Sequence, residues 1–390
     1  MSSRTPTTQA GHFVYESAEQ RVVFASGLGR ETVTDEVERR GARRILLVAA
    51  ASEAAMAEEL THDVGVAGRF TDVRQHVPAG CAEAATRAAR TADADLLLSV
   101  GGGSTTGTAK AVARATGLPI LAVPTTYAGS EATPVWGLTV DGRKTTGTDR
   151  SVLPRVVIYD AVLTRSLPVA LSVSSGLNAL AHGVDAWWAP RQNPISSALA
   201  TEAVRTLATG LVGVVADPQD VGAREDLLYA TYLSGVAFAA AGSGLHHKIC
   251  HVLGGAWDLN HADTHAIILP HVAGLNLPAV PDAQRRLLTA LTDGGASGGP
   301  GTAGDPLGAL VALYTRLDAP RALRDLGLHE RDLDRASALI LEQVPPGNPR
   351  PVTRAVLRGM LQRAWAGEPA QLVPLTSEAP IGSATGPASR

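Results

Sequence analysis

The N-terminal part of the chain alternates short apolar runs with segments of helical character. Four runs are apolar almost without interruption: residues 43–50, 95–100, 118–126 and 155–160. Residues 51–60 and 101–116, which follow the first two runs, are expected to be helical. Continuous apolar runs, unlike alternating ones, are typical of parallel strands in a sheet that is covered on both faces. The pattern therefore predicts an α/β domain with a parallel sheet over residues 11–165.

The hydrophobic pattern changes at about residue 165. Beyond it the chain shows mainly helical periods broken by Pro and Gly, with long helices expected at 227–241 and 244–257. The simplest architecture adds an all-helical domain at residues 166–372, with the active site in the cleft between the two domains. Three segments rich in Gly, Ser, Thr or Pro are expected to be flexible: 1–10, 293–305 and 373–390.

Composition argues against several classes of protein. With 390 residues, 45% of them hydrophobic and 18% charged, the chain is long enough for two folded domains and unlike a disordered protein. The net charge of −3 and the lack of a basic block argue against a nucleic-acid partner. The two cysteines give no disulfide framework, the N-terminus has no apolar signal, and no stretch approaches about 20 apolar residues. We expect a cytoplasmic protein without a membrane partner.

A glycine-rich turn follows the second apolar run. Gly101, Gly102, Gly103 and Ser104 lie between that strand and the next helix. Glycines let the backbone adopt positive φ and approach a ligand closely, and a helix N-terminus presents unpaired N–H groups to a phosphate. The spacing is not the GxGxxG fingerprint of dinucleotide-binding folds, and a tight turn without a ligand has the same residues.

A second candidate segment, rich in small hydroxyl side chains, follows the third apolar run. Thr125, Thr126 and Ser130 lie where that strand is expected to end. Open α/β sheets bind ligands at the carboxyl ends of their strands. An ordinary polar loop has the same composition, but two such segments at one sheet edge favour a nucleotide.

A set of histidines falls on the expected helices of the C-terminal half. Asn178 and His182 are four residues apart, as are His247 and His251, so each pair shares a helix face. His261 follows after a Gly-Gly break. Helices assemble divalent-metal sites from such pairs with one further His. A single His is more often a hydrogen-bonded structural group, but the whole set favours a polar active site.

Whether a metal binds to this set is a separate question. A carboxylate is the expected fourth ligand, but the matching position holds Asn178, and a neutral amide is a much poorer ligand. Asp185, three residues after His182, is placed less suitably. The sequence thus predicts a histidine-rich pocket that lacks one anionic ligand. If a metal binds there, its expected ligands are His182, His247 and His261.

At this point the residues resemble a known family, the iron-containing alcohol dehydrogenase superfamily, over about residues 12–368. The positions that match its pattern are Gly101–Ser104, Lys110, Thr125–Thr126, Ser130–Glu131 and the spacing of His247, His251 and His261. In that family an Asp and three His hold a divalent metal. The Asp falls on Asn178, and the three His ligands fall on His182, His247 and His261. A further His, often assigned to proton transfer, falls on His251.

Several departures from the dehydrogenase pattern resemble one branch of the superfamily, the maleylacetate reductases. Gly107 stands where the dehydrogenases usually have Asp, and the segment 124–137 is one residue shorter than usual. Four other segments resemble the same branch: 142–160, 174–182, 244–255 and 348–353. In that branch Asn is usual at the metal-ligand position, and a metal is often held not to be required.

The resemblance implies that a homodimer reduces maleylacetate, a small dicarboxylate, to 3-oxoadipate with NADH or NADPH during the degradation of aromatic compounds. Hydride goes to an alkene carbon, and negative charge moves onto the ketone oxygen as an enolate. We expect His251 to donate the proton, and His182, His247 and His261 to hold or polarise the substrate oxygens as protonated imidazoles without a metal. Asn178 removes a negative charge from the pocket, which favours an anionic substrate.

The residues that bind substrate carboxylates and select the cofactor have weaker signals. Candidate carboxylate ligands are Tyr127, Lys248, Arg350 and Lys144. Tyr127 adjoins the second hydroxyl-rich segment, and Lys144 is also a candidate for cofactor binding. The acidic residue that selects NADH usually ends the first strand. This chain has Ala50 there, so NADPH is allowed and NADH is not excluded.

Three alternatives remain open at this stage. A metal-dependent alcohol dehydrogenase, or an aldehyde or enone reductase of the same fold recruited to another pathway, would lose activity to a chelator. A lyase or cyclase resembling dehydroquinate synthase would use bound NAD without net consumption of NAD(P)H. A catalytically silent binding protein is disfavoured by the intact histidine set and the glycine turn.

Overall fold

A six-stranded parallel sheet forms the core of the N-terminal half in the computed structural model, which describes residues 12–140, 143–293 and 304–374. Its strand order is β1-β8-β5-β4-β2-β3, and every neighbouring pair is parallel. The strands are β1 (Arg21–Phe24), β2 (Ile45–Val48), β3 (Val66–Phe70), β4 (Leu96–Gly101), β5 (Ile120–Pro124) and β8 (Val156–Tyr159). The predicted α/β fold with a parallel sheet is confirmed, and the four predicted strands correspond to β2, β4, β5 and β8.

Helices cover both faces of this sheet, because successive strand residues point to opposite faces. Helices α1 (Gly29–Arg40) and α2 (Ala54–Leu60) cover one face, and α3 (Ala79–Thr91) and α4 (Gly103–Thr116) cover the other. Leu96 and Leu98 pack in the cluster with α1 and α2, whereas Leu97 packs in the cluster with α3 and α4. All three leucines are fully buried, which explains the continuous apolar run of β4.

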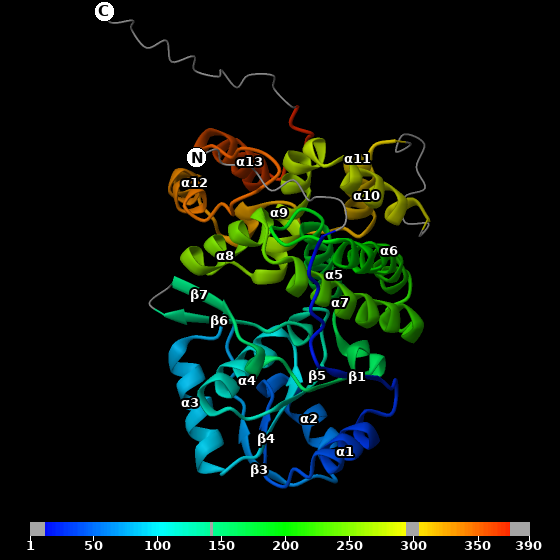
Figure 1. The fold of residues 1–390 in the computed structure, drawn as a ribbon, viewed down its shortest axis with the longest axis vertical. Helices are drawn as coiled ribbons and strands as arrows, with labels where there is room; N and C mark the ends of the chain where they lie inside the picture. The colour runs from blue at the N-terminus through cyan, green and yellow to red at the C-terminus, as the bar shows by residue number, and fades with distance from the viewer. Residues whose placement is uncertain (1–11, 141–142, 294–303, 375–390) are drawn as a thin grey trace, which may run out of the picture.

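The sequence pattern does not predict the antiparallel hairpin of β6 (Val135–Val140) and β7 (Arg143–Thr148). The side chains of β6 are half-buried or exposed, so no apolar run marks the strand. Strand β7 contacts a helix of the C-terminal half, α8 (Leu245–Trp257), and the hairpin lies between the two halves in Figure 1. It therefore contributes to the wall where the two halves meet.

The C-terminal half is helical, as predicted, and lies against one end of the sheet (Figure 1). Besides α8, its α-helices are α5 (Val169–Ala186), α6 (Pro194–Ala216), α7 (Val221–Ala241), α9 (His261–Asn276), α10 (Pro281–Asp293), α11 (Pro306–Arg316), α12 (Leu333–Leu341) and α13 (Arg354–Ala366). Helix α5 is buried along most of its length against α6, α7 and α9. The predicted helices at 227–241 and 244–257 correspond to α7 and α8.

Short 3-10 helices connect several of these elements. They are η1 (Ala51–Glu53), η2 (Ser130–Ala132), η3 (Arg150–Val152), η4 (Ala161–Ser166), η5 (Leu277–Ala279), η6 (Leu323–Leu326) and η7 (Glu330–Asp332). The sheet half ends with β8 and η4, and α5 begins at Val169, close to the domain boundary expected near residue 165.

The three segments expected to be flexible fall largely outside the described residues, which exclude 1–11, 294–303 and 375–390. The described end of the chain is attached to the helical half. The backbone N–H of Val373 donates to the carbonyl of Gly274 at 2.9 Å, and Arg350 Nη2 donates to the carbonyl of Pro374 at 2.9 Å. Residues 373 and 374, which were assigned to the expected tail, are thus hydrogen-bonded to the helical half.

Helix α6 corrects the expectation that no stretch is apolar enough to cross a membrane. By length and composition alone α6 could cross a membrane. Its most apolar window has a mean hydropathy of 1.4, and 50% of that window is buried. It packs against α5, α7 and α10. A core helix of a folded bundle satisfies the same test, so α6 is weak evidence for a membrane.

Lys110 of α4 fixes the segment that follows β5. Its side chain is fully buried, and Nζ donates to the carbonyls of Ser130 at 2.6 Å, Thr133 at 2.7 Å and Val135 at 2.8 Å. The buried carboxyl of Glu131 lies in the same segment. The Lys110 amino group thus donates to carbonyls of an irregular segment that would otherwise be buried without donors, and burial lowers its pKa to about 7.

We predict that Lys110→Met destabilises the fold by about 3 kcal/mol or more, because three carbonyls lose their donor while the apolar volume is kept. Urea denaturation of the purified protein would measure the change. Lys248→Met, which truncates a half-buried lysine of α8, should change the free energy of unfolding by about 0.5 kcal/mol or less. Equal stability of Lys110→Met and the unmodified protein would contradict this role of Lys110.

Helices α8 and α9 bury three histidines that the sequence analysis did not assign to the site. Burial lowers the pKa of His246 to about 3 and that of His271 to about 4, and it lowers the pKa of His265 well below its ordinary value. His246 Nε2 and His265 Nδ1 are 2.9 Å apart and share one hydrogen bond. All three rings are therefore neutral in the folded protein at neutral pH.

We predict steep acid destabilisation from these buried rings. In the unfolded chain each binds a proton below a pKa of about 6.5, but in the folded chain it does so only at much lower pH. The free energy of unfolding should therefore fall as pH drops from about 6.5 towards 4, by about 1.4 kcal/mol per pH unit for each ring. Urea denaturation at several pH values would show it. His271→Gln should reduce the slope, whereas replacing the exposed His62 by Gln should not.

Candidate active site

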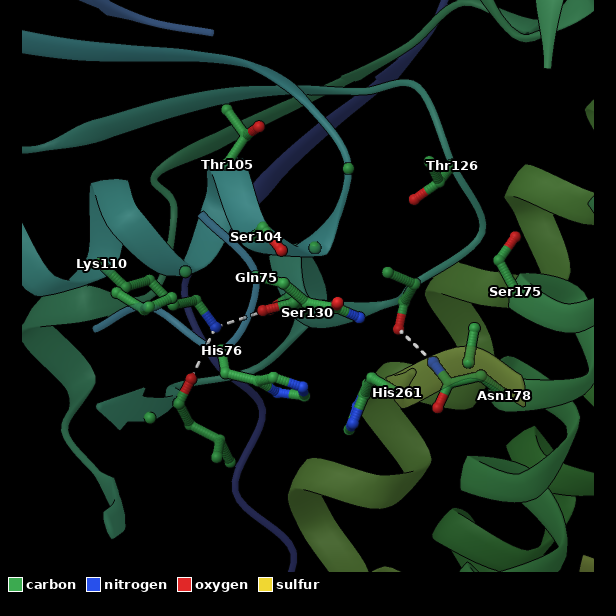
Figure 2. Close-up of a pocket in the computed structure, with 18 of the residues that line it drawn as sticks. Gln75, His76, Ser104, Thr105, Lys110, Thr126, Ser130, Ser175, Asn178 and His261 are labelled. Atoms are coloured by element: carbon green, nitrogen blue, oxygen red, sulfur yellow. Dashed lines mark hydrogen bonds between the residues drawn. The ribbon is translucent and has the colours of Figure 1, made fainter. Parts of the chain in front are cut away.

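A cavity of about 480 Å³ lies between the sheet and the helical half. The sheet half contributes the glycine turn, the segment after β5 and the hairpin, and the helical half contributes α5, α7, α8 and the start of α9. Figure 2 shows Ser104, Thr126 and Ser130 from the sheet half facing Asn178 and His261 from the helical half. The size is in the ordinary range for a small-molecule site.

The glycine turn forms one wall of this cavity. Gly101 ends β4 with a φ of 150°, and a Cβ there would lie 2.5 Å from Thr105 Oγ1. A Cβ on Gly102 would lie 2.9 Å from Thr126 Cγ2. Gly102, Gly103 and Ser104 line the cavity where α4 begins. The turn is therefore a cradle that side chains would fill, and the N–H groups and positive end of α4 suit a phosphate.

Glu53 lies next to the glycine turn, and the sequence analysis did not identify it. Thr125 Oγ1 donates to Glu53 Oε1 at 2.7 Å. Burial raises the pKa of the Glu53 carboxyl, against hydrogen bonds from Thr125 and from the backbones of Ala50 and Gly102 that lower it. Thr125 thus ties β5 to η1 and is absent from the described residues that line the cavity, whereas its neighbour Thr126 lines it.

The four histidines of the candidate site come together on the opposite wall. His182 of α5, His247 and His251 of α8 and His261 of α9 all line the cavity. Ring centroids are 4.9 Å apart for His182 and His247, 6.3 Å for His247 and His251, and 6.5 Å for His251 and His261. They form a row of neighbouring rings along the helical wall.

His182, the first ring of the row, is not the protonated imidazole that the sequence analysis expected. Burial, followed by the charge on His247, lowers the pKa of His182 well below its ordinary value. His182 is therefore neutral at physiological pH. A neutral ring still donates one hydrogen bond, so it can orient a substrate oxygen without carrying a charge.

Asp185 holds His247 in place. Its carboxylate is fully buried, with Oδ2 2.8 Å from His247 Nδ1 and also accepting from the N–H of Gly244 at 2.8 Å. Oδ1 accepts from Trp188 Nε1 at 2.8 Å. The carboxylate fixes the orientation of the imidazole, as a supporting partner behind a functional His does in other sites. The sequence analysis considered Asp185 only as a metal ligand and missed this contact.

The residues at the family's metal position do not fit a divalent ion well. Asn178 Nδ2 donates to the carbonyl of Ala128 at 3.2 Å, and Asn178 Oδ1 is buried without a hydrogen-bond partner among the described residues. Among these same residues, ligand atoms within 4.8 Å of one another occur in one group of three only, His246, Cys250 and His265, which lies behind the cavity wall. The three histidines at the ligand positions are not such a group, although His182 Nδ1 is also buried without a hydrogen-bond partner among the described residues.

Two of the expected carboxylate ligands are corrected by the structure. Tyr127 is fully buried, where its hydroxyl donates to Thr164 Oγ1 at 3.1 Å and accepts from Arg224 Nη1 at 3.0 Å. The side chain of Tyr127 therefore belongs to the core and not to the cavity wall. Arg350 donates to backbone carbonyls of α9 and the chain end, including Leu275 at 3.3 Å.

Two other candidates are not placed at the cavity. Lys248 lies on α8 but is absent from the described residues that line it. The backbone of Lys144 lies in β7, and its side chain is outside the described part of the structure.

The cavity contains lining residues that the sequence analysis did not identify. They are chiefly Gln75, His76, Trp136, Ser175, Phe238 and Asn260. Gln75 and His76 precede α3 in a segment without apolar periodicity, and Trp136 lies in the unpredicted hairpin. The ring of Phe238 lies tilted against His182 and His247, with centroid distances of 4.9 Å and 4.4 Å. The only sequence signal at Phe238 is the helical period of α7, and this period predicts a core position rather than a cavity-lining one.

Family models and curated relatives match nearly the whole described chain. The model described as "Iron-containing alcohol dehydrogenase" matches residues 19–161, and "Fe-containing alcohol dehydrogenase family, C-terminal" matches residues 172–365. A maleylacetate reductase of Sphingobium indicum is 45% identical over 92% of this chain and 98% of its own length. Maleylacetate reductase 1 of Rhodococcus opacus is 41% identical over 92% of this chain and 98% of its own.

Solved structures agree with these matches. An iron-containing alcohol dehydrogenase from Corynebacterium glutamicum has a TM-score of 0.87 and 46% identity, covering 92% of this chain and 98% of that one. Maleylacetate reductase from Rhizobium sp. strain MTP-10005 has a TM-score of 0.83 and 42% identity, covering 92% and 99%. The chain therefore belongs to the iron-containing alcohol dehydrogenase family and is an NAD(P)-dependent oxidoreductase.

Proposed function

We propose that this protein reduces maleylacetate to 3-oxoadipate with NADH or NADPH, as a cytoplasmic homodimer. The observation that carries the proposal is the neutral amide of Asn178 in a histidine-lined cavity beside the glycine turn. Without a carboxylate at this position, the wall that faces the cofactor site suits an anionic substrate better than a cation. Relatives with 39–45% identity over most of the chain are named maleylacetate reductase.

The sheet wall fits a dinucleotide. Gly102 and Gly103 leave room for a pyrophosphate at the start of α4, and Ser104 adds a hydroxyl donor. Ala50 and Ser52 line the cavity beyond β2 without a negative charge. Glu53 lines the cavity beside them, where its carboxyl accepts a hydrogen bond from Thr125 and burial raises its pKa. This wall is compatible with either NADH or NADPH. The reduced nicotinamide, when bound, supplies the hydride.

The histidine row supplies the remaining chemistry. Hydride addition to the alkene carbon β to the ketone places negative charge on the ketone oxygen. His182, His247 and His261 hold or polarise the substrate oxygens, the ketone oxygen among them, and Asp185 keeps the ring of His247 oriented. His251 donates a proton to the other alkene carbon, which is bonded to the ketone carbon. One hydride and one proton are consumed, and the carbon–carbon double bond becomes a single bond.

We propose that this reaction needs no divalent metal. Two observations support this: Asn178 replaces an anionic ligand, and the histidines at the ligand positions do not converge on one point as a tetrahedral site requires. A second candidate is a metal-dependent alcohol dehydrogenase, because the solved structure with 46% identity carries that description. The two differ in their response to a chelator.

The first test is oxidation of NADH or NADPH by the full-length, EDTA-treated protein with maleylacetate. We expect consumption of cofactor with a kcat on the order of 1 to 1000 s⁻¹, and the same kcat before and after EDTA. The decrease in nicotinamide absorbance measures it, with the metal content of the sample determined in parallel. Activity that returns only with added Zn²⁺ or Fe²⁺ would refute the metal-free proposal. No activity under any of these conditions would refute the substrate.

We further predict that Asn178→Asp gains metal and loses reductase activity. The new carboxylate supplies the missing anionic ligand beside His182, so bound Zn²⁺ or Fe²⁺ should rise towards one per chain. Activity with the metal removed should fall at least about tenfold, because a buried carboxylate repels the dianion. Asn178→Ala is the matched control and should not raise the metal content. A metal content in Asn178→Asp equal to that control would contradict the prediction.

A further inference from the structure

The segment before α3 contains two consecutive strained residues. His76 has a φ of 60° and Val77 a φ of 49°, both in the left-handed region that favours glycine. A β-branched residue such as Val is a genuine outlier there. Strained backbone of this kind persists only where the surroundings impose it, and it gathers at functional sites.

Two elements of the sheet half impose this conformation. Thr139 of β6 donates from Oγ1 to the carbonyl of His76 at 2.8 Å and from its N–H to the carbonyl of Val77 at 3.1 Å. On α4, a Cβ at Gly107 would lie 2.9 Å from Val77 Cγ2. Gly107 therefore leaves the space that Val77 occupies. This is the position at which the sequence departs from the Asp usual in the dehydrogenases.

The strain places the imidazole of His76 at the cavity. His76 lines the cavity, and its ring lies near His261 in Figure 2, with the two ring centroids 6.1 Å apart. Nε2 lies 3.3 Å from the carbonyl of Leu259 and 3.6 Å from Asp258 Oδ1. The side chain is only 6% exposed. His76 thus extends the histidine row of the helical half by one ring that comes from the other half of the protein.

We propose that His76 binds the substrate carboxylate that is separated from the ketone by one methylene group. The proposal rests on maleylacetate as the substrate. The other carboxylate is bonded to the carbon that accepts hydride, so its place is set by the nicotinamide. A ketone oxygen held by the histidine row leaves the second carboxylate one carbon away, within reach of the neighbouring ring. Nε2 of His76 is near the Leu259 carbonyl and Asp258, and an imidazole N–H can donate a hydrogen bond to a carboxylate oxygen.

A purely structural role of His76 makes a different prediction. His76 also joins the two halves through Leu259, and loss of that contact alone would impair every substrate equally. A carboxylate ligand, in contrast, matters only for substrates that contain that carboxylate. The discriminating probe is cis-acetylacrylate, which is maleylacetate without the second carboxylate and keeps the conjugated ketone.

The test measures kcat and KM for maleylacetate and cis-acetylacrylate in the full-length protein and in His76→Ala and His76→Gln. We expect the KM for maleylacetate to rise about 10- to 100-fold in His76→Ala, with kcat changed less than about threefold. The kcat/KM for cis-acetylacrylate should stay within about threefold. The KM for maleylacetate of His76→Gln, which keeps a hydrogen-bond donor, should lie between those of the unmodified protein and His76→Ala. His62→Ala, an exposed histidine, is the control.

A second variant tests the support without touching the imidazole. Gly107→Ala should displace Val77 and weaken maleylacetate binding selectively, and adding Val77→Ala should restore it because the clashing methyl group is gone. Equal losses for both substrates, or an unchanged KM for maleylacetate in His76→Ala, would overturn the proposal. Failure of the unmodified protein to reduce maleylacetate refutes the proposed substrate instead, so the two failures are distinguishable.

Discussion

The buried carboxylate of Asp185 is the contact on which the site depends. It accepts hydrogen bonds from the N–H of Gly244, from Trp188 Nε1 and from the ring of His247, so one side chain joins α5 to the start of α8. A Cβ on Gly244 would lie 2.7 Å from the Asp185 carboxyl carbon, so only glycine allows this approach. Burial raises the pKa of the Asp185 carboxyl, and the hydrogen bonds from Trp188 and the N–H of Gly244 act against that shift. The orientation of His247 and the position of the start of α8 therefore depend on this carboxyl.

The two walls of the cavity divide the recognition of negative charge between them. On the sheet side, backbone N–H groups and the α4 dipole suit phosphate without any cationic side chain. On the helical side, burial keeps His182 neutral, so the ring acts as an oriented donor that needs no counter-ion. A carboxylate at Asn178 would place a negative charge between these two walls. The proposed preference for an anionic substrate therefore depends on this single amide.

The sequence pattern predicts the parts of the fold whose side chains are buried on both faces. Strands β2, β4, β5 and β8 are fully buried and appear as apolar runs. The edge strands β1 and β3 are short and partly exposed, β3 contains a glycine, and the hairpin is half-buried, so no periodicity marks them. Helical spacing likewise places His182, His247 and His251 correctly on their faces. Glu53 and Asp185 were missed because their partners are 72 and 62 residues away, and Tyr127 was misjudged because Thr126 faces the cavity and its neighbour faces the core.

Two departures from the dehydrogenase pattern, at Asn178 and Gly107, affect opposite walls of the cavity. At Asn178 the helical wall loses a negative charge, and at Gly107 the sheet wall loses a side chain, which creates the space that Val77 fills. Each change alone alters one wall. With both changes, imidazoles from both halves of the protein line the same cavity. His76 belongs to the sheet half and His261 to the helical half. A substrate held by both would therefore bind only when the two halves are correctly positioned relative to each other. Recognition of the second carboxylate would then also position the alkene against the cofactor, so binding energy from a remote group contributes to orientation at the reacting carbon.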